Sequence, residues 1–121
     1  MITVNITLKQ NLLHSFTVTG HGEFPAGKDI VCAGVSSISQ TILGILLEYF
    51  GKNINYIKEK GFLKVEIVNA EILDVDTSNS PTPDQKKSKT VLEVITRTFL
   101  IGLNYISNSR PGSITITVKE L

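Results

Sequence analysis

The chain has 121 residues, which suits one domain, and we expect a single domain over residues 1–121. Hydrophobic residues make up 41% and charged residues 19% of the sequence, as is ordinary for a soluble globular protein. The formal net charge of +1 gives no strong attraction to nucleic acids or membranes. We therefore predict neither direct nucleic-acid binding nor membrane association.

The cysteine count and the N-terminus both bear on where the protein resides. A single cysteine excludes an internal disulfide and disfavours the disulfide framework of a secreted domain. The N-terminal MITVNITLKQ lacks the basic and apolar regions of a signal peptide. We find no run of about 18 apolar residues, the length that a membrane span needs. These features predict a cytoplasmic protein.

Metal and cofactor sites find little support in the sequence. His14, His21 and Cys32 show no paired ligand spacing of the kind that structural zinc sites use. No glycine-rich phosphate loop ends in Lys-Ser or Lys-Thr. We predict no metal and no cofactor.

The N-terminal residues predict a β-hairpin. Apolar and polar residues alternate over residues 2–8, which is typical of a half-buried strand. Residues 9–11 predict a turn, and a second alternating run over residues 15–19 predicts a strand that pairs with the first. His14 stands at the start of that strand, where we expect an exposed or edge position.

The segment 20–28 follows this hairpin and contains Gly20, Gly22 and Gly27. Glycine adopts backbone angles that are closed to other residues, so we predict a flexible loop. Two interpretations stay open. The loop is either a flap that shapes a site when a substrate arrives or an ordinary long connection.

A helix is predicted from about Ile30 to Phe50. Asp29 precedes it at the N-cap position, and Gly51 follows it at the C′ position. The apolar residues recur with a helical period and are Val31, Val35, Ile38, Ile42, Ile45, Leu46 and Tyr49. A polar stretch on this helix consists of Ser36, Ser37, Ser39 and Gln40.

Two strands are predicted next, at residues 53–58 and 62–68, and residues 69–76 could extend the second strand. The polar segment 76–89 contains two prolines, which indicates a surface loop, and we favour a solvated loop over a partner-contacting arm. Thr82 to Gln85 has capping-box spacing with a proline at the first helical position. The second helix is therefore expected to start there or slightly later.

The second helix carries a wide apolar surface, which suggests heavy burial that includes a subunit contact. Its apolar residues are Val91, Leu92, Ile95, Phe99, Leu100, Ile101, Leu103 and Ile106. Residues 108–112 end the helix, and residues 114–118 alternate as a final strand. The order β-β-α-β-β-α-β predicts an α+β fold, with two helices packed on one face of a largely antiparallel sheet.

The reactive groups that lie closest together in the sequence are His21 and Cys32. Cys32 is expected in the first helical turn, near unpaired backbone N–H groups and the positive end of the helix dipole. That setting favours the nucleophilic thiolate and can bind an oxyanion, while His21 supplies a general base and acid. From the residues alone, a small buried cysteine and a solvated turn histidine remain the alternative.

The segments Gly20-His21 and GKDIVCAGVS at residues 27–36 resemble the ribosomal-processing cysteine protease family Prp, and the resemblance covers nearly the whole chain. It implies a cysteine-protease domain in which His21 and Cys32 are the catalytic pair and Asp29 and Ser36 are supporting residues. Gly22 and Gly34 replace alanines that are common in the family. Both replacements exchange one small residue for another.

The same resemblance implies an endopeptidase that removes the N-terminal extension of a large-subunit ribosomal protein during ribosome assembly. The precursor of that ribosomal protein is then the peptide substrate, cut beside an aromatic residue, and the enzyme is a homodimer. Two alternatives stay open. One is a ribosome-assembly binding protein whose Cys32 does no chemistry, and the other is a thiol hydrolase that acts on a different amide or thioester.

Overall fold

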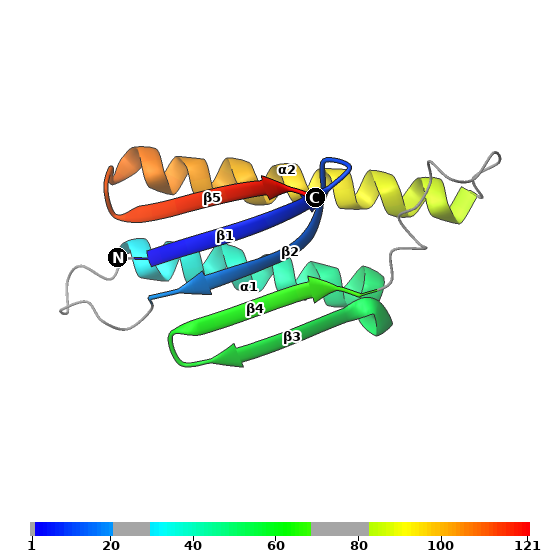
Figure 1. Cartoon of the computed structure of the whole chain (residues 1–121), viewed down its shortest axis with the longest axis horizontal. Coiled ribbons are helices and arrows are strands. Elements are labelled where there is room, and N and C mark those ends of the chain that lie inside the picture. The colour runs from blue at the N-terminus through cyan, green and yellow to red at the C-terminus, as the bar shows by residue number, and fades with distance from the viewer. Residues whose placement is uncertain (1, 21–29, 69–82) are drawn as a thin grey trace.

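The computed structural model describes residues 2–20, 30–68 and 83–121. Its elements are β1 (Ile2–Lys9), β2 (Leu12–Thr19), α1 (Ile30–Phe50), the 3-10 turn η1 (Gly51–Asn53), β3 (Ile54–Glu59), β4 (Phe62–Ile67), α2 (Pro83–Ser109) and β5 (Ile114–Glu120). Figure 1 shows both helices on the same face of one sheet, running in opposite directions. The predicted α+β fold and its element order are confirmed.

The sheet has five strands in the order β3-β4-β2-β1-β5. Neighbouring strands are antiparallel except β1 and β5, which are parallel. Val4, Val18 and Leu63 lie in register across β1, β2 and β4. Because alternate residues of a strand point to opposite faces, this row and its neighbours form an apolar layer beneath the helices.

The first hairpin closes through Gln10 and Asn11, whose φ angles are 54° and 64°. Two successive positive φ angles define a tight turn whose twist matches that of the flanking strands. Leu8 pairs with Leu13 while Thr7 pairs with Ser15, so His14 is the extra residue of a β-bulge. The expectation of an exposed or edge position for His14 is wrong, since it is half-buried in an inner strand.

Thr96 of α2 connects that bulge to the helical layer. Its hydroxyl oxygen accepts a hydrogen bond from the Leu13 N–H at 2.9 Å and donates one to the Leu92 carbonyl at 2.7 Å. The Thr96 side chain is 4% exposed. One buried hydroxyl therefore satisfies a backbone donor next to the bulge and fixes α2 against β2.

The two helices meet closely at two complementary contacts. A methyl group added at Gly102 would overlap the Cδ1 atom of Ile38, and one added at Gly34 would lie 3.4 Å from Cδ1 of Ile106. Each helix thus places an isoleucine against a glycine of the other. Beneath them, the rings of Phe16 and Phe99 pack edge to face with centroids 4.7 Å apart.

The α1 boundaries agree with the prediction, but its end and its buried face differ in detail. Gly51 does not adopt the positive φ of a C′ glycine, because the chain continues there as the 3-10 turn η1. Tyr49, predicted on the apolar face, is 54% exposed. The side chains that α1 buries are Val35, Ser39, Ile42, Leu43, Leu46 and Phe50.

The segment Ile30–Asn53 is long and apolar enough to cross a membrane by length and composition, with a mean hydropathy of 1.9. The prediction that no segment is this apolar is therefore wrong. In the structure this segment packs across the sheet and contributes Ile42, Leu46 and Phe50 to the core. The core helix of a globular domain meets the same criterion.

The predicted surface loop 76–89 is wrong over its last part, because α2 begins at Pro83. Proline is well suited to the first helical turn, where its missing N–H would have no partner, as the capping-box spacing indicated. Residues 69–82 lie outside the described part of the chain.

The heavy burial expected for α2 holds for Leu92, Phe99 and Leu103, whereas Ile101 is 51% exposed on the opposite side of the helix.

We expect the substitution Thr96→Val to lower the free energy of unfolding by about 1–3 kcal/mol, since the Leu13 N–H stays buried without its acceptor. Urea denaturation measures this loss. Thr98 provides a matched control, because it bonds the Val94 carbonyl at 2.7 Å but is exposed. Thr98→Val should change the free energy by less than about 0.5 kcal/mol. Equal losses in the two variants would contradict this role of Thr96.

Candidate active site

Three elements meet at one end of the molecule, where α1 begins, β2 ends and the β3–β4 hairpin turns (Figure 1). The Gly20 N–H donates a hydrogen bond to the Gly61 carbonyl at 3.2 Å. The φ angles of these two residues are 98° and 77°, which glycine adopts without strain. The first residue of the predicted loop 20–28 is thus fixed to the hairpin turn.

Cys32 lies at this end, in the first turn of α1, because the helix begins at Ile30 as the periodicity predicted. Its side chain is half-buried and packs against the hydrophobic core. The first turn of the helix carries no acidic residue. The first four backbone N–H groups of a helix have no partner within it and point to where an anion would bind.

The other residues predicted around Cys32 fall largely outside the described residues. They are His21, Gly22, Gly27 and Asp29. The pairing of His21 with Cys32 therefore stays a prediction, as does the capping role of Asp29. Gly20 and Ile30, which flank this segment, are both described.

A cavity of about 140 Å³ lies between α1 and the β3–β4 hairpin; we call it the hairpin pocket. Its lining residues are Ser36, Ser39, Gln40, Lys58, Glu59, Gly61, Phe62 and Leu63. Ser36, predicted as a supporting residue, is therefore part of a pocket wall. It follows Cys32 by four residues, about 6 Å along the helix axis at 1.5 Å per residue.

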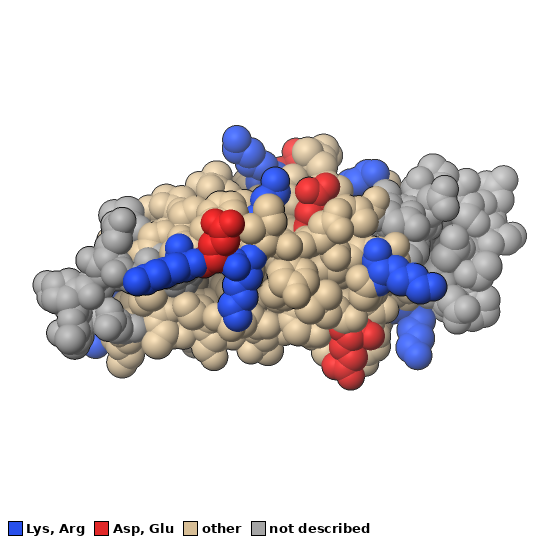
Figure 2. Space-filling view, turned by 90° about the horizontal axis from the view of Figure 1, so that it is seen from below, with Lys and Arg blue, Asp and Glu red and all other residues tan. Residues whose placement is uncertain are grey.

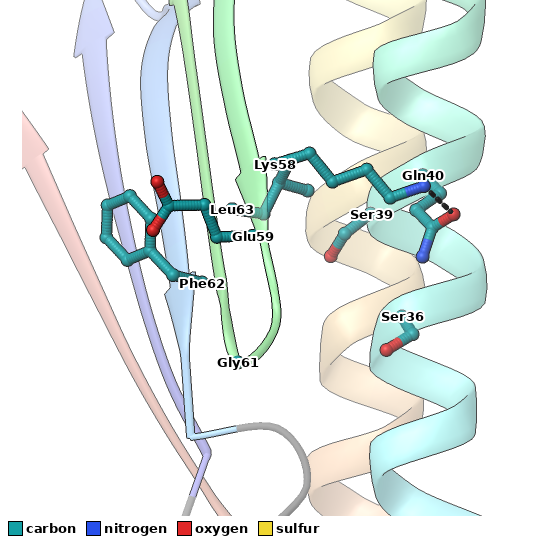
Figure 3. Close-up of a pocket in the computed structure, with 8 residues that line it drawn as sticks. All are labelled: Ser36, Ser39, Gln40, Lys58, Glu59, Gly61, Phe62 and Leu63. Atoms are coloured by element: carbon teal, nitrogen blue, oxygen red, sulfur yellow. Dashed lines mark hydrogen bonds between the residues drawn. The ribbon is translucent and has the colours of Figure 1, made fainter.

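Figure 3 shows which of these side chains point into the hairpin pocket. Ser36 and Ser39 project from α1 toward the hairpin, and Leu63 faces them from β4. The side chains of Glu59 and Phe62 point to the other face of the sheet, so these residues border the pocket through their backbone.

Lys58 closes the pocket on its outer side. Its side chain extends from β3 toward α1, and Nζ donates a hydrogen bond to Oε1 of Gln40 at 3.0 Å (Figure 3). Both residues are exposed. No carboxylate pairs with the Lys58 ammonium group within the part of the chain that the structure describes.

Ser39 is a pocket residue that sequence reasoning did not single out. It is 0% exposed, and its hydroxyl oxygen has no hydrogen-bond partner among the described residues. The sequence signal was its position, since Ser39 interrupts a buried helical period that runs through Val35, Ile42 and Leu46. Ser39 has polar neighbours in the sequence, so it was interpreted as part of a polar stretch and its place in the buried period was missed.

The charges and potential metal ligands around the site are sparse. Among the described residues, no three His, Cys, Asp or Glu side chains are grouped so that they could hold a metal ion. On the face drawn in Figure 2, Lys and Arg side chains are interspersed with Asp and Glu among uncharged residues. Positive charge forms no continuous patch over the described residues of that face.

Structural comparison finds several crystal structures that cover this chain almost completely. The ribosomal processing protease Prp of S. aureus in complex with a substrate peptide is 22% identical, with a TM-score of 0.68 over 98% of this chain and 100% of that chain. The same protease with a covalently linked product peptide is 25% identical, with a TM-score of 0.64 and the same coverage. A protein of Streptococcus mutans is 22% identical, with a TM-score of 0.69 over 100% of this chain and 96% of that chain.

Sequence comparison assigns the family. No curated protein sequence matches the chain. The family model of the cysteine protease Prp, however, matches residues 1–115 and so includes both helices and the segment around Cys32. Since this match spans nearly the entire sequence, the chain belongs to the cysteine protease Prp family.

Proposed function

We propose that this protein is a cysteine endopeptidase of the cytoplasm that removes the N-terminal extension of a large-subunit ribosomal protein during ribosome assembly. The observation that carries the proposal is the position of the chain's single cysteine in the first turn of α1, in a chain of a cysteine protease family. The S. aureus relative is a ribosomal processing protease that binds a substrate peptide, which supports the substrate class.

In the acylation step, the Cys32 thiolate attacks the carbonyl carbon of the scissile peptide bond. The carbonyl π electrons move to oxygen, and backbone N–H groups of the first turn of α1 stabilise the resulting oxyanion. The oxyanion collapses, the C–N bond breaks, and the His21 imidazolium donates a proton to the leaving amine. The products of this step are a free amine and a thioester on Cys32. The relative with a covalently linked product peptide supports such an intermediate.

In the deacylation step, water attacks the thioester carbonyl while His21 accepts a proton from the water. The C–S bond breaks, the Cys32 thiolate and the His21 imidazolium are restored, and the N-terminal fragment leaves as a carboxylic acid that loses its proton to solvent. Two residues have supporting roles. Asp29 caps the helix, although its negative charge opposes the thiolate, and the Ser36 hydroxyl contacts the peptide from the pocket wall.

We expect Cys32→Ser to lower the rate of precursor cleavage by at least about 1000-fold, because a serine hydroxyl in a site built for a thiolate is a poor nucleophile. His21→Ala should lose activity in the same experiment. The measurement is mass spectrometry of the ribosomal-protein precursor after incubation with each purified variant. Ser37→Ala is the control, since Ser37 is exposed on the same helix.

A single N-terminal truncation by the native protein and the Ser37→Ala control, absent with Cys32→Ser, is the expected result. An intact precursor with folded, reduced native protein refutes the processing role. Labelling of Cys32 by iodoacetamide near neutral pH then separates the two alternatives. A reactive thiol indicates a hydrolase of another amide or thioester, and an inert thiol indicates a binding protein.

The proposal includes a homodimer, and α2 offers a surface for it. Val94, Ile101 and Tyr105 are 59%, 51% and 72% exposed. Their spacing of seven and four residues puts them on one side of the helix. An apolar stripe of this kind is costly to leave in water and is suited to a second copy.

We expect Ile101→Lys to shift the sedimentation of the protein from dimer to monomer, because a charged group would be desolvated at the contact. Analytical ultracentrifugation at several concentrations measures the shift. Ile57→Lys is the matched control, since Ile57 is 50% exposed on β3, away from α2. A native protein that sediments as a monomer at all concentrations would refute the dimer.

A further inference from the structure

Ser39 differs from the other hydroxyl residues in the helices. Five other hydroxyl side chains of α1 and α2 donate to the carbonyl one turn earlier, namely those of Thr41, Thr90, Thr96, Thr98 and Ser109. Such a bond is the usual way for a helical serine or threonine to satisfy its donor. The Ser39 hydroxyl makes none, although the residue is fully buried.

A buried hydroxyl without a partner loses its hydration and gains nothing in return, so it destabilises the fold. Ser39 also lines the hairpin pocket, and its side chain projects toward the hairpin, where Leu63 faces it (Figure 3). The hydroxyl has no exposed surface in this conformation, so it borders the pocket from behind the residues that close it. The structure therefore combines a cavity with an unused hydrogen-bonding group at its base.

We propose that the hairpin pocket is a substrate subsite that receives an uncharged polar side chain, ending in a hydroxyl or a carboxamide, and that the Ser39 hydroxyl is its hydrogen-bond partner. This inference rests on the proposed function, since it treats Cys32 as the position of the scissile bond. Ser39 is a specificity-determining residue in this scheme and takes no part in the chemical steps.

The position of the hairpin pocket along α1 suits this role. Cys32, Ser36 and Ser39 follow one another at spacings of four and three residues, so they share one side of the helix. Ser39 lies about 10 Å from Cys32 along the helix axis, at 1.5 Å per residue. An extended peptide advances about 3.3 Å per residue, so this subsite takes a residue about three positions from the scissile bond.

Access to Ser39 depends on Lys58 in this arrangement. The Lys58 side chain crosses the pocket to Gln40, and both partners are exposed, so water readily replaces that hydrogen bond. When a substrate side chain enters, Lys58 leaves Gln40 and the hydroxyl becomes reachable. The Lys58 ammonium then donates to the substrate from the rim of the pocket.

The chemistry of the lining decides among the classes of side chain. An apolar side chain would leave the Ser39 hydroxyl unpaired, which costs binding energy. A carboxylate would lose its hydration against Ser39 and Leu63, and Lys58 is too exposed to compensate for that loss. A hydroxyl or carboxamide is neutral and can both donate and accept, so it satisfies Ser39.

The test uses a positional-scanning decapeptide library, so the natural substrate does not have to be identified first. Each comparison uses two peptides that are identical except at one position, where one carries Thr and the other Val, or one carries Asn and the other Leu. The cleavage rates of the two peptides are compared at each of three positions on either side of the scissile bond. We expect the native protein to prefer the polar member by about tenfold or more at one position. Ser39→Ala should reduce that preference to less than about threefold, whereas the Ser37→Ala control should keep it.

Binding to the same library separates this inference from the proposed function. If Cys32→Ser binds the library with a preference that the further change Ser39→Ala removes, the subsite holds even where the native protein cleaves nothing. If the native protein cleaves but Ser39→Ala keeps the full preference, the subsite is refuted and the protease function stands. A preference for Asp over Asn at the position, or no polar preference anywhere, also overturns the subsite.

The melting temperature gives a second readout that requires no peptide. Ser39→Ala removes the unpaired hydroxyl, so it should raise the melting temperature by about 2–5 °C more than Ser37→Ala does. The control contributes the same gain in helix propensity at an exposed position. A melting temperature that falls on Ser39→Ala would mean that the hydroxyl already has a partner in the free protein, and the inference would be wrong.

Discussion

The structure depends on how α1 is held against α2 and the sheet, because this packing fixes the direction in which the first turn of α1 points. The contacts of Ile106 with Gly34 and of Ile38 with Gly102 allow the helix axes to approach closely. Gly34 lies two residues after Cys32. A side chain at Gly102 would overlap Ile38 and force the helices to adjust, whereas a methyl group at Gly34 would only make ordinary contact with Ile106. The N–H groups beside Cys32 would move with any such adjustment of α1. The packing between the two helices therefore helps to set the position of Cys32 and of the N–H groups beside it.

Much of the fold followed from the period of the apolar residues. Alternation predicted β1, β4 and β5, the helical period predicted α1 to the residue, and the element order predicted the α+β class. The bulge at His14 was not predictable, because it depends on a register with β1 and on the Thr96 hydroxyl, which is 83 residues from Leu13 in the sequence. The start of α2 was predicted by its capping motif, although its polar composition suggested a loop.

The chemistry of the site was predictable from the sequence, whereas the residues that line the hairpin pocket were less predictable. The helix start, inferred from Asp29 and the periodicity, was enough to place Cys32 in the first turn. The hairpin pocket was not predictable, since it forms where α1 faces β3 and β4, and the sequence does not specify that pairing of surfaces. Ser39 illustrates the difference. Its unusual character appears only when the neighbouring residues are known to be buried and its hydroxyl is seen to lack a partner.

The two halves of α1 have different roles, which explains how one helix can serve both the core and the site. Its C-terminal half buries Ile42, Leu46 and Phe50 against the sheet, and these apolar contacts hold the helix in place. Its N-terminal half presents Cys32 and Ser36 only half-buried, next to the hairpin. The pocket residues Gln40 and Lys58 are exposed, so they can change with little effect on the core, whereas Ser39 and Leu63 are buried. Substrate preference can therefore diverge among proteins that share this fold.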